Sequence, residues 1–459
     1  MANRGHFSSK FGFIAAAAGS AVGLGNIWKF PFEVGQGGGA LFLIIYLIFC
    51  FVLCYPILIT EISIGRKSEK SAAVAFDQLG YKKWTFLGKL GVLCGVMILS
   101  FYNVVAGWVF GYFVEIVKGN FDIGNEFGAF TTNIWRTGIY SIAFLVFTTI
   151  IVSQGITKGI EKASKILMPV LIGIILLLVF YAFTLPNSGA GVEYYLVPDF
   201  SKLSLQVVYK ALGQSFFSLS LGLGALITYG SYLERHENIV FSGALITLAD
   251  VGIAFLAGLM IFPFVFYQGI DPEGGAALIF QTMPGIFESM GSFWGIFIGG
   301  LFFLLLSFAA LTSTISLLEL PVAYFVDQKK WKRKRAVWVS GLIIFLLGVP
   351  SLLGNGYSAF FTEFITYFGT DSPRDYMTFI GDVFIDTLLP LGGFLTAIFA
   401  IHVWKKGNLV SELSDGADNF AGSWLNTYII FSLKYIAPVI LGAIFIFTVL
   451  EKFFSISIL

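Results

Sequence analysis

The chain has 459 residues, of which 57% are hydrophobic and only 12% carry a charge, and its mean hydropathy is +0.85. A soluble protein carries about twice that charged fraction, so the composition indicates a polytopic protein of the lipid bilayer. The net charge of +1 offers no basic excess for a nucleic-acid partner, and nothing in the composition indicates an oligomeric state.

Eleven apolar stretches are long enough to cross a bilayer as helices. They lie at residues 11–34, 39–65, 87–116, 137–154, 165–185, 206–230, 239–267, 295–326, 337–354, 380–404 and 427–450. Lys and Arg gather before the first stretch and after every second one that follows, so all basic clusters lie on one side of the membrane. The positive-inside rule then predicts a multi-pass protein of the cell's inner (plasma) membrane with a cytoplasmic N-terminus.

The first stretch contains glycines where a membrane helix is deepest. Gly19, Gly23 and Gly25 are followed by the polar Asn26 and the cationic Lys29. Glycine weakens a helix interior by about 1 kcal/mol relative to alanine. The pattern therefore predicts a helix that is broken at mid-membrane, where released backbone groups hold a small ion or ligand. The alternative is a glycine-rich face that packs against another helix.

A second interruption follows in the sixth stretch. Gly222-Leu223-Gly224 repeats the pattern Gly23-Leu24-Gly25 five helices later. Two interrupted helices in corresponding positions indicate an inverted repeat with a binding site between its halves. We expect an all-α fold with one transmembrane domain over residues 1–459, in which 11–185 and 206–404 are five-helix repeats and 427–450 is an additional eleventh helix.

Five segments carry a resemblance to a known family. They are AGSAVGLGNIWKFP at 18–31, GITKGIEKASKILMP at 155–169, GQSFFSLSLGLGALITYGSY at 213–232, AGLMIFP at 257–263 and FAALTSTIS at 308–316. In this order they resemble the neurotransmitter:sodium symporters, specifically the bacterial eleven-helix amino-acid transporters of the leucine-transporter type. The resemblance implies a transporter with alternating access, not an enzyme, and no catalytic constellation is visible.

The family's two sodium sites would fall on oxygen-bearing groups, which suit an alkali cation. The first would use the Ala21 carbonyl and the side chains of Asn26, Ser218 and Asp250. The second would use the carbonyls of Gly19, Val22 and Ala309 with the hydroxyls of Thr312 and Ser313. Taken alone, these hydroxyls also fit hydrogen bonds back to their own helix.

Asp250 bears on two questions, whether transport needs chloride and whether it moves a proton. A carboxylate within the membrane is costly and indicates a function. Chloride-dependent members of the family have a neutral residue at this position and a serine one turn later, where this chain has Ala254. The resemblance therefore implies that chloride is not required. The alternative is an Asp250 that carries a proton during transport.

Gly23 determines the expected substrate class. Monoamine transporters of the family have an aspartate at this position, whereas glycine leaves space for a substrate carboxylate. The resemblance implies a neutral hydrophobic or aromatic amino acid as substrate, and an osmolyte such as betaine or taurine is the alternative. The substrate-binding residues would be Ser20, Ala21, Gly23, Leu24, Gly25, Ile98, Tyr102, Phe217, Ser218, Ser220, Leu223, Ser313 and Leu317.

Ion pairs would close the two ends of the transport path. The resemblance implies an outer pair of Lys29 and Asp382, where the family usually has arginine in place of Lys29. It implies an inner pair of Arg4 and Asp327 near Tyr232. Glu61 would support the unwound part of the sixth helix by accepting backbone N–H bonds. An ion channel and a non-transporting amino-acid sensor are the alternatives outside transport.

Overall fold

A computed structural model describes residues 5–269, 278–417 and 419–456. In this part of the chain the secondary structure is helical, apart from one isolated antiparallel bridge between Ile365 and Arg374. Helices dominate because a backbone in hydrocarbon must satisfy its own N–H and C=O groups. The all-α fold class predicted from the sequence is confirmed.

The helices follow one another with short connections. Those of the first half of the chain are α1 (Lys10–Ala21), α2 (Phe30–Gln36), α3 (Ala40–Phe49), α4 (Tyr55–Ser68), α5 (Ala72–Gln78), α6 (Thr85–Val117), α7 (Phe127–Thr132), α8 (Ile134–Ser153), α9 (Lys162–Phe183), α10 (Ser188–Leu196) and α11 (Leu205–Ser218). Those of the second half are α12 (Ala225–Gly230), α13 (Ile239–Tyr267), α14 (Met283–Ser289), α15 (Ser292–Lys329), α16 (Arg333–Leu353), α17 (Ala359–Thr362), α18 (Tyr376–Ile380), α19 (Leu388–Ile398), α20 (Lys406–Ser414), α21 (Trp424–Phe431) and α22 (Ala437–Phe454).

Several of these helices join through short π-helical segments into single spans. Among the described residues, nine continuous helices are long and apolar enough to cross a membrane, and the bent pair at 10–36 makes ten. The predicted span 206–230 consists of the shorter helices α11 and α12 with six residues between them. The predicted count of eleven spans is therefore not confirmed by length and composition.

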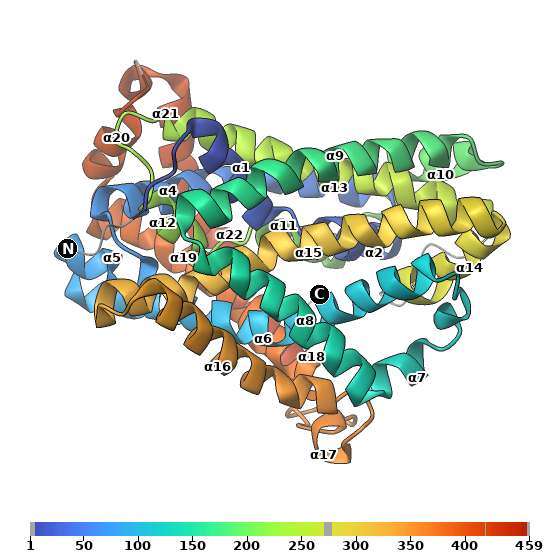
Figure 1. Cartoon of the computed structure of the whole chain (residues 1–459). Helices are drawn as coiled ribbons and strands as arrows, with labels where there is room; N and C mark the ends of the chain where they lie inside the picture. The colour runs from blue at the N-terminus through green and yellow to red at the C-terminus, as the bar shows by residue number, and fades with distance from the viewer. Residues whose placement is uncertain (1–4, 270–277, 418, 457–459) are drawn as a thin grey trace.

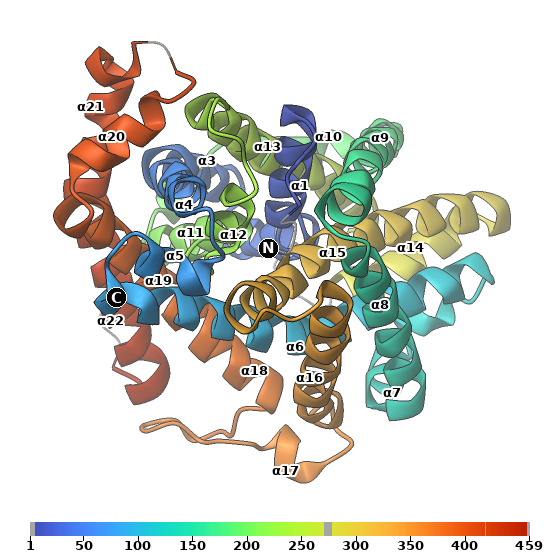
Figure 2. The ribbon, with the colours of Figure 1, turned by 60° about the vertical axis from the view of Figure 1, so that its left-hand side comes forward.

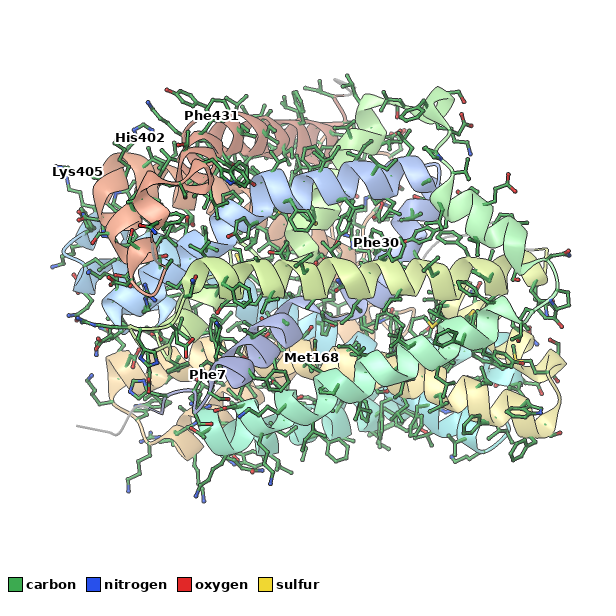
Figure 3. All side chains as sticks on the ribbon, turned by 90° about the horizontal axis from the view of Figure 1, so that it is seen from above. Phe7, Phe30, Met168, His402, Lys405 and Phe431 are labelled. Carbon is green, nitrogen blue, oxygen red and sulfur yellow. The ribbon has the colours of Figure 1, made fainter. Side chains whose placement is uncertain are left out.

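The first predicted break is present in the structure. The helix α1 ends at Ala21, and the chain bends by 51° before it continues through a π-helical segment, Gly25–Lys29, into α2. Figure 2 shows α1 surrounded by other helices of the bundle, and Figure 3 shows Phe7 and Phe30 on the two sides of the bend. Because residues 15–27 around the bend are all buried, the backbone groups freed there face protein.

The second predicted break separates α11 from α12. Residues 219–224 form turns, and Ser220, Gly222 and Gly224 have φ values of +53°, +81° and +72°. Glycine adopts this left-handed region without steric cost, which explains two of the three residue choices. A side chain at Gly222 would also overlap the Leu389 carbonyl of α19.

The two ends of the bundle differ in their short elements. In Figure 1, α5 and α20 lie at one end with the N-terminus, whereas α7, α10 and α14 lie at the other. His402 and Lys405 lie at the first of these ends in Figure 3. The long helices α6 and α15 pack against each other more extensively than any other described pair. They link both ends of the molecule past the two breaks.

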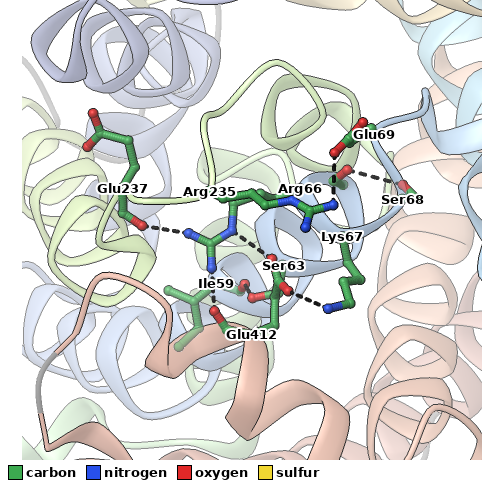
Figure 4. Close-up of polar contacts among 10 residues, drawn as sticks. Ile59, Ser63, Arg66, Lys67, Ser68, Glu69, Arg235, Glu237 and Glu412 are labelled. Atoms are coloured by element: carbon green, nitrogen blue, oxygen red, sulfur yellow. Dashed lines mark hydrogen bonds and ion pairs between the residues drawn. The ribbon is translucent and has the colours of Figure 1, made fainter.

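A buried arginine holds α20 against α4. Arg66 is 1% exposed, and its Nε donates to Glu412 Oε1 of α20 at 2.7 Å. Its remaining nitrogens donate to the carbonyls of Glu237 and Glu412, and Lys67 lies 3.3 Å from Glu412 Oε2 (Figure 4). A buried guanidinium requires such partners, so these bonds fix the segment after the tenth predicted helix onto the bundle.

We predict that Gly65→Ala destabilises the protein, because its Cβ would overlap the Ile227 carbonyl where α4 crosses α12. Overpacking of this kind costs about 1–3 kcal/mol. Thermal unfolding in detergent is expected to occur at a lower temperature. Gly173→Ala is the control, since nothing lies within 4 Å of its new Cβ. Equal unfolding temperatures for the two variants would contradict the close crossing.

Candidate functional site

A small cavity lies between the two broken helices. Its volume is about 30 Å³. The described residues that line it are Ser20, Ala21, Gly23, Gly25, Ile98, Tyr102, Phe217, Ser218, Ser220, Leu223, Ser313, Leu317 and Leu389. All but Leu389 are predicted substrate-binding residues, so the fold brings together side chains from segments far apart in the sequence. The cavity holds about two water molecules, so a larger ligand requires its walls to move apart.

Backbone groups at the first break are turned toward this cavity. The Leu24 N–H, the one predicted substrate group that does not line the cavity, donates to the Tyr102 hydroxyl at 3.1 Å. Ser220 Oγ of the second break donates to the Ser20 carbonyl at 3.1 Å. The buried Ser20 Oγ has no hydrogen-bond partner among the described residues. Since an unpaired buried hydroxyl is costly, Ser20 is a ready contact for a polar ligand.

Gly23 keeps the cavity open on one side. A Cβ at this position would overlap Ser313 Oγ and lie 3.1 Å from the Tyr102 hydroxyl. At Gly25, a Cβ would lie 2.9 Å from Cε1 of Phe217. Any larger residue at either position would therefore occupy the space between the two breaks.

The predicted first sodium site forms a polar cluster in an apolar interior. Ser218 Oγ lies 3.0 Å from Oδ1 and 2.9 Å from Oδ2 of Asp250, and Asn26 Nδ2 donates to Asp250 Oδ1 at 2.7 Å and to Ser218 Oγ at 2.9 Å. Asn26 and Asp250 are fully buried. Ala21 lines the adjoining cavity together with Ser218. The side chains of Asn26, Ser218 and Asp250 therefore meet at one place, and Ala21 lies beside the adjoining cavity.

The Asn26 amide has a defined orientation in this cluster. Its Oδ1 accepts the Gly23 N–H at 3.0 Å, whereas its nitrogen faces Asp250. Ligation of a cation through Oδ1 would require the amide to turn over. The Tyr46 hydroxyl of α3 lies 3.2 Å from both Ser218 Oγ and Asp250 Oδ2. Sequence reasoning missed Tyr46, because one tyrosine within an apolar span gives no signal of its own.

The predicted second sodium site lies where α15 meets the first break. Thr312 Oγ1 lies 3.2 Å from the Val22 carbonyl and 3.0 Å from the Ala309 carbonyl, and Ser313 Oγ lies 3.4 Å from the Val22 carbonyl. Gly19 faces Thr312, since a Cβ on Gly19 would lie 3.3 Å from the Thr312 Cβ. The Thr312 hydroxyl contacts both its own helix and the first break, whereas Ser313 Oγ is directed to the Val22 carbonyl at the break.

The donor set suits an alkali ion better than a transition metal. Within the described residues, no group of three or more His, Cys, Asp or Glu is placed to hold a metal ion. Carbonyl, hydroxyl and carboxylate oxygens are the donors that hard cations prefer.

Two further side chains hold the breaks in place. Glu61 Oε1 of α4 accepts the Gly222 N–H at 2.8 Å, which is the kind of bond expected for this residue. Gln214 Nε2 of α11 donates to the Gly25 carbonyl at 2.8 Å. Gln214 was not singled out in the sequence, although a glutamine one turn before a helix break is a recognisable signal.

The structure corrects the predicted outer ion pair. Asp382 is paired with Lys452 of α22, which also contacts Asp386. Lys29 makes no ion pair among the described residues, and its ammonium lies 4.6 Å from the centre of the Phe217 ring. The physical reason is that the two carboxylates, four residues apart, share one face, where one ammonium neutralises both. The aromatic ring attracts the Lys29 charge instead.

The inner end contains a second, unpredicted ion pair. The predicted pair of Arg4 with Asp327 lies outside the described residues, because Arg4 is not among them. Asp327 Oδ2 accepts the Ser71 N–H at 2.8 Å. The Tyr232 hydroxyl donates to the fully buried Glu319 at 2.8 Å, and Arg333 holds the same carboxylate with bonds of 3.0 and 2.6 Å. Glu319 is an acid within an apolar helix, and that signal marks it as functional.

Comparisons with known proteins show the family to which the chain belongs. Residues 4–133 and 125–455 match the model of the sodium:neurotransmitter symporter family. A sodium-dependent transporter of Bacillus subtilis is 35% identical over 447 residues, which are 96% of each chain. One of Haemophilus influenzae is 33% identical over 96% of this chain and 97% of its own. The human sodium- and chloride-dependent taurine transporter is 24% identical over 98% of this chain and 78% of its own.

A solved structure is similar over almost the whole chain. The crystal structure of MhsT in complex with L-phenylalanine matches with a TM-score of 0.87 and 39% sequence identity. The match covers 97% of this chain and 99% of that chain.

We predict that Lys452→Gln lowers the thermal unfolding temperature more than Lys29→Gln does. The first change leaves Asp382 and Asp386 without their cation, and hydrogen bonds to charged groups contribute about 1.5–3 kcal/mol each. The second change removes only a contact with a ring, which is worth about 0.5–1 kcal/mol at an exposed site. Purified variants in the same detergent provide the comparison. A larger loss for Lys29→Gln would restore the outer pair predicted from the sequence.

Proposed function

Because this chain belongs to the sodium:neurotransmitter symporter family and is a sodium-dependent symporter, not an enzyme, we propose that it takes up neutral hydrophobic or aromatic amino acids. The observation that carries this proposal is the lining of the cavity between the breaks. It combines polar groups, of which the Ser20 hydroxyl has no partner among the described residues, with the apolar Ile98, Leu223 and Leu317, and no described lining residue is charged. A hydrophobic amino acid likewise combines polar ammonium and carboxylate groups with an apolar side chain.

The proposed substrate lies with its carboxylate toward the first break. Gly23 provides the space there, and the Leu24 N–H and the Tyr102 hydroxyl, which now bond each other, are the donors for the carboxylate. The Ser20 hydroxyl and the backbone carbonyls of Phe217 and Ser218 are the proposed contacts for the ammonium group. The apolar side chain then contacts Ile98 and its neighbours, where burial contributes about 25 cal/mol per Å² of apolar area.

An osmolyte is the second candidate, since taurine transporters are among the relatives. Taurine carries an ammonium and a sulfonate but no apolar side chain. The aliphatic residues of the cavity would contribute little to its binding. The relative of known structure that is 39% identical was crystallised with L-phenylalanine, which also supports the amino acid.

We propose that two sodium ions move with the amino acid, one at each oxygen cluster, and that chloride is not required. The Asp250 carboxylate, held by Asn26, Ser218 and Tyr46, brings a fixed negative charge to the first cluster. This negative charge balances the positive charge of a bound cation. With a neutral residue at this position, an added anion such as chloride would have to do so. A proton on Asp250 is the alternative form of coupling.

The proposed transport cycle exposes the site to one side at a time. On the outer side, Phe217 lines both the cavity and a depression of about 460 Å³, which Lys29, Asp386 and Lys452 also line. On the inner side, Tyr232, Glu319 and Arg333 form a hydrogen-bonded group. We propose that the N-terminus lies in the cytoplasm, so the inner group opens to the cytoplasm.

We predict sodium-dependent uptake of leucine, methionine, tyrosine or tryptophan into proteoliposomes. Replacement of external sodium by potassium is expected to abolish uptake, whereas replacement of chloride by gluconate leaves it unchanged. An excess of taurine or betaine is not expected to compete. Competition by taurine but not by leucine would assign the site to an osmolyte. Uptake driven by a proton gradient alone would overturn sodium coupling.

We predict that Asp250→Asn lowers sodium-driven uptake by at least about tenfold, because the fixed charge contributes about 1.5–3 kcal/mol through its hydrogen bonds. Added chloride is expected to restore part of the activity, since it replaces the lost charge. Asp77→Asn, at an exposed position on α5, is the matched control. Full activity of Asp250→Asn without chloride would remove Asp250 from the ion site.

A further inference from the structure

A second cavity opens on the outer surface of the bundle, away from the candidate transport site. Its volume is about 320 Å³. It lies between α5, α6, α15 and α16, and its described lining residues are Ala73, Lys89, Val92, Leu93, Val96, Pro321, Tyr324, Phe325, Ser340 and Ile343. Apart from Lys89, the lining is apolar or uncharged. The transport site proposed above uses none of these residues.

The lining residues lie on single faces of three helices. On α6, positions 89, 92, 93 and 96 have the spacing of one helical face, as do 321, 324 and 325 on α15 and 340 and 343 on α16. Glycines occupy another face of α6, where Gly91 packs against the Leu223 carbonyl and Gly95 against Leu320. The glycine face therefore packs into the bundle, and the cavity face is directed toward the surrounding membrane.

The cavity lies near one end of the bundle. Lys89 is four residues from the start of α6 at Thr85, and Phe325 is four residues from the end of α15 at Lys329. At 1.5 Å per residue, both lie about 6 Å inside their helix ends. This end carries α5 and the basic loop with Lys82 and Lys83, the predicted cytoplasmic side. The cavity is thus within reach of lipid headgroups on that side.

Lys89 is the one cation among the described lining residues of this cavity, which include no carboxylate. Lys89 is exposed and makes no ion pair or hydrogen bond within the described part of the chain. The Trp331 ring stacks on the lining residue Phe325 at 4.6 Å, and the Arg335 guanidinium lies 4.5 Å from the Trp331 ring. Lys89 therefore places a positive group at the apolar hollow, whereas Arg335 lies behind Trp331, outside the lining.

A buried hydroxyl in the wall has no partner. Ser340 is 1% exposed, and its Oγ makes no hydrogen bond among the described residues. Many serines buried within the helices of this chain donate to a carbonyl of their own helix, as Ser316 does at 2.9 Å, whereas Ser340 does not. An unpaired hydroxyl at this position is the second, independent indication of a ligand, because a bound ester or hydroxyl group would satisfy it.

We propose that this cavity binds one anionic phospholipid from the membrane leaflet at this end. An acyl chain occupies the apolar hollow, the glycerol ester lies within reach of Ser340, and the phosphate pairs with Lys89. A free phosphate would gain nothing from the apolar walls, and a neutral lipid would leave Lys89 unpaired. The bound lipid contacts α6, which carries Tyr102, and α15, which carries Ser313 and Glu319, so it braces two helices of the transport site from outside.

Lipid binding to the full-length protein is measured by native mass spectrometry. Delipidated protein in detergent is titrated with phosphatidylglycerol or with phosphatidylcholine of the same acyl chains. The dissociation constant of the first lipid bound is expected to be at least about fivefold lower for phosphatidylglycerol, because a basic residue near an anionic headgroup contributes about that factor. Equal constants for the two lipids would overturn the proposal.

Variants distinguish the cavity from the general basic surface. Lys89→Gln is expected to weaken phosphatidylglycerol binding about fivefold and to leave phosphatidylcholine binding unchanged. Lys83→Gln is the matched control, because Lys83 is an exposed lysine just before α6 that does not line the cavity. An equal effect of both variants would indicate a diffuse surface attraction and overturn the specific site.

Variants that fill the cavity with a larger side chain provide a second test of lipid binding. Ser340→Leu adds apolar volume and removes no hydrogen bond, so it is expected to weaken the binding of both lipids while sodium-dependent uptake continues. Val92→Phe fills the same hollow if Ser340→Leu does not fold. Unchanged phosphatidylglycerol binding in the filled variant would overturn the proposal. Displacement of the lipid by millimolar inorganic phosphate would assign Lys89 to a free anion instead.

Discussion

The whole molecule depends on side chains that satisfy backbone groups at two helix breaks inside an apolar bundle. An unpaired N–H or C=O costs several kcal/mol where no water is present. Here the Tyr102 hydroxyl accepts the Leu24 N–H, Glu61 accepts the Gly222 N–H, and Gln214 donates to the Gly25 carbonyl. Because these partners come from α6, α4 and α11, the breaks persist only while the surrounding helices stay assembled.

The same constraint explains why glycine and polar residues alternate at the centre. Gly23 and Gly25 bring the first break within contact of Ser313 and Phe217, and Gly222 brings the second break against the Leu389 carbonyl. Close approach leaves a cavity of only about 30 Å³, with its polar groups bonded to one another. An ion or ligand at this place competes with existing hydrogen bonds, so binding and rearrangement are coupled by necessity.

Residue patterns in the sequence were sufficient for the architecture at the centre. The paired Gly-Leu-Gly motifs located both breaks, because glycine weakens a helix interior and the same pattern occurs in two corresponding helices. The family resemblance named twelve of the residues that line the cavity. The resemblance also implied that Asn26, Ser218 and Asp250 lie together, and the cost of a carboxylate in hydrocarbon singled out Asp250. These signals are local, since each depends on a residue being unusual for its own segment.

Pairing between distant charged residues could not be predicted in the same way. Asp382 has two possible lysine partners, Lys29 and Lys452, and only the packing of α22 decides between them. Tyr46 gave no signal because tyrosine is common in apolar spans. The bidentate contact of Arg333 with Glu319 depends on how α16 turns back against α15. Three-dimensional packing determines these contacts, whereas composition and spacing carry no record of it.

Lys452 also imposes an order on biosynthesis. It lies on the last helix, α22, yet it neutralises Asp382 and Asp386, which leave the ribosome about seventy residues earlier. Chains are made from the N-terminus, and their segments enter the membrane in turn. Until α22 is inserted, the two carboxylates lack the ammonium that neutralises them. The part of the bundle around Asp382 and Asp386 can therefore close only after translation of the α22 segment.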